Sequence, residues 1–195
     1  MKKLLQAILT IALALIAQSL PAQTIGIKTD VLADAFTNIN LGFEVGLSQK
    51  WSLDVSGEYN PFTFSDNRKW KHLTIQPEAR YWFCQKMFGH FIGINAAGGK
   101  YNVGNIDADF KFLGTDFGKL KNYRFAGWFV GAGIAYGYTW MLSKHWNLEA
   151  EIGIGWSYTR YDQYECVVCG KKLKSDAPHN FVGPNKAVLN LVYVF

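Results

Sequence analysis

Two cysteines form the sharpest chemical motif in the chain. Cys166 and Cys169 are separated by two residues and followed by Gly170, a turn that can aim two thiolates at one centre. Such a turn is half of a tetrahedral zinc site, and His179 is the nearby residue that would add a third ligand. A complete site needs four ligands, and the sequence holds no second Cys-x-x-Cys pair. A disulfide or free thiols are the simpler interpretation in an oxidising compartment, while metal binding and redox chemistry stay open.

A second set of reactive groups is charged and occurs at alternate positions of otherwise apolar segments. Opposite charges there could pair inside a core or line a narrow proton- or cation-selective path. Because a lone buried ion costs several kcal/mol, we expect a salt-bridged network centred on Arg80 and Lys28, with the path as the alternative. The members of this predicted polar network are Lys28, Glu44, Asp54, Glu58, Glu78, Arg80, Glu149 and Glu151.

Two histidines each follow a hydroxyl and a carboxylate. His72 comes after a Ser-Asp pair at 65–66, and His179 comes after one at 175–176. Histidine with such partners can activate a nucleophile for hydrolysis or acyl transfer. Neither spacing matches a nucleophile motif, and histidines in loops are usually solvated. We therefore expect no enzyme and no cofactor, and keep a lipid A-modifying hydrolase or acyltransferase as the alternative.

The elements that must position these groups begin after an export signal. The chain opens with a short basic start, continues with a nearly apolar run, and reaches small residues before Ala22. This order is typical of a secretory signal peptide. A membrane anchor would need about 20 apolar residues, and polar side chains interrupt this run too early. We predict a signal peptide at 1–22 and one domain at 23–195.

The composition excludes several classes of protein. The net charge is +5 over 195 residues, and the basic residues are scattered, which argues against nucleic-acid binding. Three cysteines are too few for a disulfide scaffold. Aromatic residues make up 16% of the chain and there are 19 glycines, a composition that the following pattern explains.

Apolar and polar residues alternate in eight segments, strictly in six and more weakly at 25–33 and 91–103, which predicts strands with one apolar and one polar face. Phe43 and Val45 flank Glu44, for example, and Leu53 and Val55 flank Asp54. The segments begin near residues 25, 39, 51, 73, 91, 128, 146 and 189.

The apolar faces are predicted to meet lipid. Aromatic residues gather toward the ends of these faces, as at Trp51 and Tyr59, where a membrane interface requires them. Glycines gather on the opposite faces, where the lumen of a small barrel is narrow. Short connections alternate with long ones, as in outer-membrane barrels. We predict an all-β, eight-stranded antiparallel up-and-down transmembrane β-barrel, with long outer loops at 61–72, 104–125 and 161–184.

Three stretches resemble a Bacteroidetes outer-membrane β-barrel family known as domain of unknown function 3575. They are residues 50–83, with the run Gln-Pro-Glu-Ala-Arg-Tyr-Trp at 76–82, residues 123–149, and the ending Tyr-Val-Phe. The resemblance implies an outer-membrane barrel, sometimes found beside fimbria-related genes, with no catalytic residues to carry over. The terminal Phe195 also resembles the final aromatic that the barrel-assembly machinery recognises.

We therefore expect an integral protein of the bacterial outer membrane with its long loops outside the cell. The expected role is surface adhesion, assembly or envelope stability through those loops, in association with fimbriae. The alternatives are the lipid A-modifying enzyme and a narrow minor channel. Expected partners are membrane lipid, lipopolysaccharide, the assembly machinery at Phe195 and fimbrial or other surface proteins, with no nucleic acid.

Overall fold

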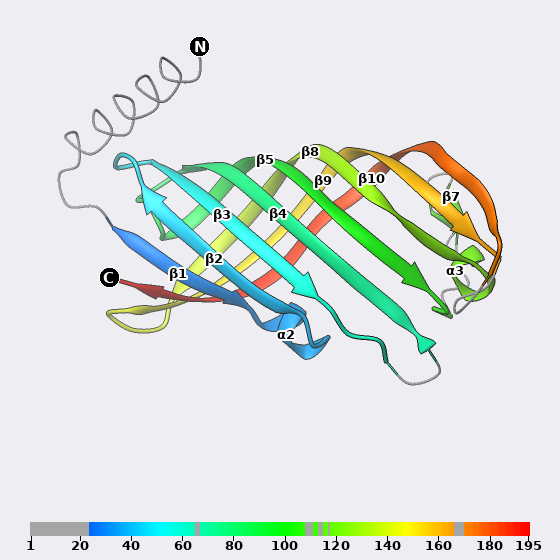
Figure 1. The fold of residues 1–195 in the computed structure, drawn as a ribbon. Coiled ribbons are helices and arrows are strands. Elements are labelled where there is room, and N and C mark those ends of the chain that lie inside the picture. Colours follow the sequence, from blue (N-terminus) through cyan, green and yellow to red (C-terminus); the bar gives the residue numbers. More distant parts are fainter. Residues whose placement is uncertain (1–23, 65–66, 108–110, 113–114, 117, 166–169) are drawn as a thin grey trace, which may run out of the picture.

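The computed structural model describes residues 24–64, 67–107, 111–112, 115–116, 118–165 and 170–195. Within them, eight antiparallel strands form one closed barrel in the order β1-β10-β9-β8-β5-β4-β3-β2 (Figure 1). The predicted fold class, an all-β ring of eight up-and-down strands, is confirmed. The barrel strands are β1 (Ile25–Asp30), β2 (Ile39–Gly46), β3 (Trp51–Asn60), β4 (Lys69–Trp82), β5 (Gly89–Gly104), β8 (Arg124–Met141), β9 (Trp146–Tyr164) and β10 (Lys172–Val194).

The remaining elements are small. A two-stranded ribbon joins β6 (Lys111–Phe112) to β7 (Thr115–Asp116). The helices are α2 (Val31–Ala35) and α3 (Lys119–Asn122). Within the described ranges, no helix has the length and apolar character needed to cross a membrane.

The barrel has two unlike ends. At the turn end, short connections at 47–50, 83–88 and 142–145 join consecutive strands. At the loop end lie α2, α3 and the longer connections. Strand length grows around the ring from 6 residues in β1 to 23 in β10. In Figure 1 the wall made by β8, β9 and β10 therefore extends far beyond the ends of β1 and β2 at α2.

The structure corrects several predicted boundaries, and β4, for example, already starts at Lys69, inside the loop predicted at 61–72. The segment at 161–184 was predicted as a loop, but β9 continues to Tyr164 and β10 starts at Lys172. Its prolines hide the alternation, although both pair with β9, as in Pro178 with Arg160. The first strand was predicted to run past Asp30 but stops there, because Asp30 caps α2 by accepting a hydrogen bond from the Leu32 N–H at 3.0 Å.

Pro77 lies within β4 at a local break in the ladder. It pairs with Val55 of β3, but the ladder with β5 passes from Ile75 opposite Gly98 to Glu78 opposite Asn95. A proline has no N–H to donate, so a strand tolerates it only where one neighbour makes no ladder bond. The barrel stays closed although residues 76 and 77 have no partner in the ladder between β4 and β5.

The interior changes character along the barrel axis. At the turn end, Trp82, Met87 and Phe91 form a small buried apolar cluster. The connection between β4 and β5 enters the barrel there, and the Met87 carbonyl accepts a hydrogen bond from the Asn147 side chain at 3.0 Å. Above this cluster the interior is polar and charged. The apolar cluster thus closes one end of the barrel beneath the charged residues.

Candidate functional site: a charged plug and the cavity above it

Arg80 is the centre of the buried charged residues, and its side chain is fully buried. Its Nε lies 2.7 Å from Glu78 Oε1. Nη1 lies 2.8 Å from Glu44 and 3.0 Å from Glu149, and Nη2 lies 2.7 Å from Glu151. The planar guanidinium can serve four carboxylates because its donors point in fixed, divergent directions. Three strands of the ring, β2, β4 and β9, are thus joined through one side chain.

Two lysines complete this network, which we call the plug. Lys28 Nζ lies 2.6 Å from Glu44, 2.9 Å from Asp54 and 3.3 Å from Glu149. Lys186 Nζ lies 2.9 Å from Glu78 and 3.0 Å from Glu151. The plug consists of Lys28, Glu44, Asp54, Glu78, Arg80, Glu149, Glu151 and Lys186.

The plug carries more negative than positive charge. Three cations face five carboxylates, which leaves a formal charge of −2 when all are ionised. Neutral donors stabilise the surplus: Asn190 donates to Glu149 at 2.8 Å, and Asn95 donates to Glu78 at 3.3 Å. Charges this deeply buried are tolerated only while they remain paired and hydrogen-bonded. The plug therefore functions as a unit, and no member can be neutralised without exposing its partners' charge.

The structure places seven of the eight residues of the predicted polar network in the plug. Glu58 lies apart, nearer the loop end, with its carboxylate 3.3 Å from His72 Nε2. Lys186 was not predicted. Lys186 lies before the last predicted strand, which begins near residue 189, and a bulge between Pro184 and Lys186 interrupts the alternation at that point. Alternation read back from the chain terminus, through Val192 and Asn190, places Lys186 on the same inner face and was the signal that could have found it.

The other candidate residues are dispersed. Cys166 and Cys169 lie outside the described residues, as does the Ser-Asp pair at 65–66. His179 lies opposite Thr159 in the ladder between β9 and β10. His72 contacts Glu58, and its Nδ1 lies 3.3 Å from the Trp70 carbonyl. Within the described part of the chain, no group of three potential ligands is placed to hold a metal ion.

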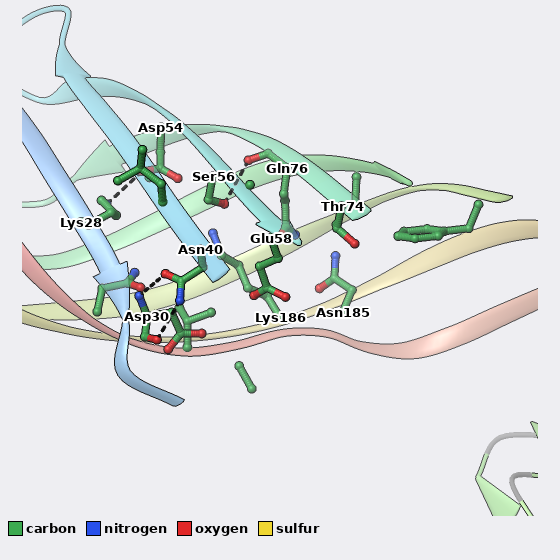
Figure 2. Close-up of a pocket in the computed structure, with 18 residues that line it drawn as sticks. Lys28, Asp30, Asn40, Asp54, Ser56, Glu58, Thr74, Gln76, Asn185 and Lys186 are labelled. Atoms are coloured by element: carbon green, nitrogen blue, oxygen red, sulfur yellow. Dashed lines mark hydrogen bonds and ion pairs between the residues drawn. The ribbon is translucent and has the colours of Figure 1, made fainter. Parts of the chain in front are cut away.

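A cavity of about 270 Å³ lies immediately above the plug, toward the loop end. Figure 2 shows its polar lining, with Lys28 beside Asp54 and Asp30 beside Asn40. β1, β2, β3, β4 and β10 contribute most of the wall, and Phe129 of β8 closes one side. The plug separates this cavity from the apolar cluster at the turn end. The cavity is thus a dead end that opens away from the turns.

The loop end of the long strands carries exposed ion pairs. Lys172 Nζ lies 2.7 Å from Asp162, and Arg160 lies 3.0 Å from Asp176. The hydrogen bond from Lys172 keeps the pKa of the Asp162 carboxyl below its ordinary value. These pairs connect β9 with β10 beyond the plug and the cavity.

Glycines make room for the side chains of the interior, which gives a first prediction. A Cβ on Gly137 would collide with the Phe91 ring and lie 2.9 Å from the Ala150 carbonyl. Gly137→Ala should lower the free energy of unfolding by about 1–3 kcal/mol through overpacking. Gly98→Ala is the matched control, because its Cβ would meet nothing closer than 3.7 Å. Urea unfolding in phospholipid vesicles, followed by tryptophan fluorescence, measures both, and equal stability of the two variants would contradict the packing described.

Comparison with known proteins gives one family. A family model described as "Protein of unknown function (DUF3575)" matches residues 7–195. No curated protein and no solved structure matches the chain.

Proposed function

Because the chain belongs to the DUF3575 family, whose description names no activity, we propose a role from the geometry of the barrel. The proposal is that the barrel is embedded in the bacterial outer membrane and sealed by its plug. Its loop end faces the outside of the cell and acts in surface adhesion, assembly or envelope stability, including the assembly of fimbriae.

The observation that carries the proposal is an apolar belt around the outside of the barrel. The belt consists of outward apolar side chains between two girdles of exposed aromatic residues, one at the turn end that includes Trp51 and Trp146, and one toward the loop end that includes Tyr59 and Trp156. Isoleucines are its most exposed members: Ile94 is 70% exposed, Ile152 68% and Ile134 61%. Water-soluble monomers rarely expose a continuous apolar surface of this extent. A surface of this kind is stable in contact with the hydrocarbon core of a bilayer.

The height of the belt supports the same proposal. On β9 the outward residues from Trp146 to Tyr158 are uncharged, and Arg160 is the first outward charge. The ten steps from Trp146 to Trp156, at about 3.3 Å each and a strand tilt of about 40°, span roughly 25 Å, which is the apolar height of outer-membrane barrels. At the turn end, Trp146 packs on Tyr193, with ring centroids 5.1 Å apart.

The plug argues against the channel alternative, which gives a second prediction. A path through the barrel would have to pass Arg80, which is fully buried among carboxylates, and then the Trp82–Phe91 pair, whose centroids are 4.6 Å apart. We expect no conductance steps when the purified barrel is inserted into planar bilayers, because the plug leaves no aqueous path. A general porin in the same bilayer is the positive control. Stable, cation-selective steps would restore the channel hypothesis.

The long strands suggest where the outer contacts are made. β8, β9 and β10 extend past the belt, so their ends stand above the membrane surface in the proposed orientation. Connections held on such a rigid wall are where binding functions concentrate. The exposed pairs of Lys172 with Asp162 and Arg160 with Asp176 hold β9 and β10 together there.

The role is tested by shortening this extension. Tyr161 pairs with Ala177, so replacing residues 162–176 by a tight turn would keep the barrel and remove the protruding hairpin. Cells with the shortened protein should insert it normally but attach to surfaces as poorly as cells that lack the gene. Equal attachment of all three strains would refute an adhesive role. If cells with the shortened protein attached like the wild type while cells that lack the gene attached poorly, the adhesive activity would lie elsewhere on the barrel.

A lipid-modifying activity is the second candidate, favoured by one contact. Glu58 could orient His72 as a general base, since their side chains lie 3.3 Å apart at the loop end. Comparing lipid A masses between wild-type cells and cells with His72→Ala tests this candidate. An unchanged mass spectrum discards it.

A further inference from the structure

The turn end of the barrel is basic. Each of its three connections contains one lysine, namely Lys50, Lys86 or Lys144, and none contains an acidic residue. Within the described residues, the terminal carboxylate of Phe195 is the one anionic group at this end, which Figure 1 marks with the letter C. The first carboxylates along the strands belong to the plug and are buried. This end of the barrel therefore carries net positive charge.

At the loop end, by contrast, exposed basic residues are paired with acids. Besides the two pairs that join β9 and β10, Lys121 Nζ lies 3.1 Å from Asp107. Lys50 and Lys144 are both exposed, and neither makes an ion pair in the part of the chain that the structure describes. Uncompensated surface charge raises the local concentration of oppositely charged partners. The partner that complements the turn end is therefore anionic.

The connections that carry Lys50 and Lys144 have the same hydrogen bonds. In each, a serine Oγ accepts the N–H of the tryptophan three residues later, at 3.2 Å for Trp51 and 3.3 Å for Trp146. The backbone N–H of the same serine donates to the carbonyl of that tryptophan, at 3.1 Å and 3.0 Å respectively. Each lysine is thus held in a short, fixed turn next to a tryptophan of the turn-end girdle.

Both lysines lie beside aromatic side chains of the turn-end girdle. Lys50 Nζ is 5.9 Å from the centre of the Tyr81 ring, which packs against the girdle tryptophan of the same connection. The connection that carries Lys144 is fixed to the girdle through His145, whose ring stacks on Tyr193 with centroids 5.6 Å apart. Tryptophan and tyrosine side chains lie at the membrane–water interface, and a lysine stem keeps its ammonium in that polar layer. Both ammonium groups are therefore within reach of lipid headgroups.

A phospholipid fits this position better than a soluble polyanion does. The two lysines flank outward tryptophans, so an anion that binds them lies at the side of the barrel, against the belt. In the proposed orientation the turn end faces the inner leaflet, which consists of phospholipids, whereas lipopolysaccharide occupies the outer leaflet. An anionic membrane surface strengthens the binding of a nearby lysine by about a factor of five.

We propose that the turn end binds the phosphate groups of anionic phospholipids through Lys50 and Lys144, while the acyl chains of these lipids pack against the belt. Lys86 adds positive charge from the third connection, where its stem passes over Gly46 at the mouth of the barrel. The barrel thereby enriches the inner leaflet around it in anionic lipid. The inference rests on the proposed function, because the lysines meet headgroups only if the belt lies in a bilayer.

The test measures which lipids stay at the barrel surface. Trace amounts of spin-labelled phosphatidylglycerol or spin-labelled phosphatidylcholine are added to phosphatidylcholine vesicles that contain the mature barrel. Electron paramagnetic resonance then gives the fraction of each label that the protein immobilises. We expect the wild type to prefer phosphatidylglycerol by at least about twofold, because a fivefold effect at two lysines is averaged over all the lipids around the barrel. Added salt should weaken this preference.

Three double variants assign the preference to the turn end. Lys50→Gln with Lys144→Gln removes both charges and should lower the preference below about 1.5-fold. Lys50→Arg with Lys144→Arg keeps both charges and should keep the wild-type value, because guanidinium groups also bind phosphate. Lys171→Gln with Lys174→Gln is the matched control, since it removes two exposed lysines at the loop end, beyond the belt, and should change nothing.

Folding of every variant is checked by the shift of unheated barrels on electrophoresis. An unaltered preference in the turn-end glutamine variant, or an equal loss in the loop-end control, would overturn the proposal. Displacement of the lipid by an excess of soluble glycerol phosphate would also overturn it, because the lysines would then form a site for free phosphate esters. If the lysines were needed only for co-sedimentation with isolated peptidoglycan, their partner would be the cell wall instead of lipid.

The same experiment separates this inference from the proposed function. A barrel that inserts into vesicles but shows no preference for phosphatidylglycerol would refute this inference alone. A protein that needs no membrane would instead refute the proposed function.

Discussion

Replacing Arg80 by methionine is expected to lower the free energy of unfolding by about 3–5 kcal/mol, the largest effect of any single substitution in the plug. Methionine has a similar length but no charge, so four carboxylates within 3.0 Å of the guanidinium would lose a partner. Their oxygens are too deeply buried for water to replace it. Urea unfolding in phospholipid vesicles, monitored by tryptophan fluorescence and by electrophoretic shift, measures the loss.

Arg160→Met is the matched control for that experiment. Arg160 also pairs with a carboxylate, Asp176, but the two side chains are 41% and 59% exposed. Exposed ion pairs contribute about 0–1 kcal/mol, so this variant should unfold almost as the wild type does. Equal stability of Arg80→Met and Arg160→Met would show that the plug does not hold the barrel together.

Placing an arginine in the middle of the apolar belt is expected to destabilise the inserted barrel by about 2–4 kcal/mol. Ile134 is the site, because it lies on β8 between Ile94 and Ile154 on the neighbouring strands. It is far from both girdles of aromatic residues that bound the belt. In hydrocarbon the guanidinium would have to reach toward the interface or draw water inward. Equilibrium folding into phosphatidylcholine vesicles gives the value.

Leu173→Arg is the control for position along the barrel. Leu173 is 47% exposed, but it lies at the loop end of β10, outside the belt. The same change of side chain there should alter stability by less than about 1 kcal/mol. If Ile134→Arg were as stable as Leu173→Arg, or more soluble than the wild type, the belt would be facing water.

Alternation of side chains made the ring predictable from the sequence. Residues such as Glu44, Asp54 and Glu149 are charged between apolar neighbours, so only a strand with two unlike faces accommodates them. That pattern is local, and it holds wherever the ladder is regular. The centre of the plug at Arg80 and Lys28 followed from the scarcity of cations among the inward positions.

The features missed by the sequence depend on irregularities and on relative strand length. The bulge before Lys186 reverses which residues of β10 face inward, and nothing local marks it except Pro184. The helix α2 is only five residues long, too short for its pattern to stand out, although Asp30 before it is a good cap. The part of β10 that extends beyond β1 follows from the difference in length between these two strands, which are remote in sequence.

Sedimentation of the mature chain after complete removal of detergent, with and without added phospholipid, tests the central claim most directly. The belt predicts that the folded barrel remains dispersed only when phospholipid vesicles or nanodiscs receive it, and that it aggregates in buffer alone. A folded, monodisperse monomer in buffer free of both detergent and lipid would contradict the claim that the apolar face of these strands contacts hydrocarbon.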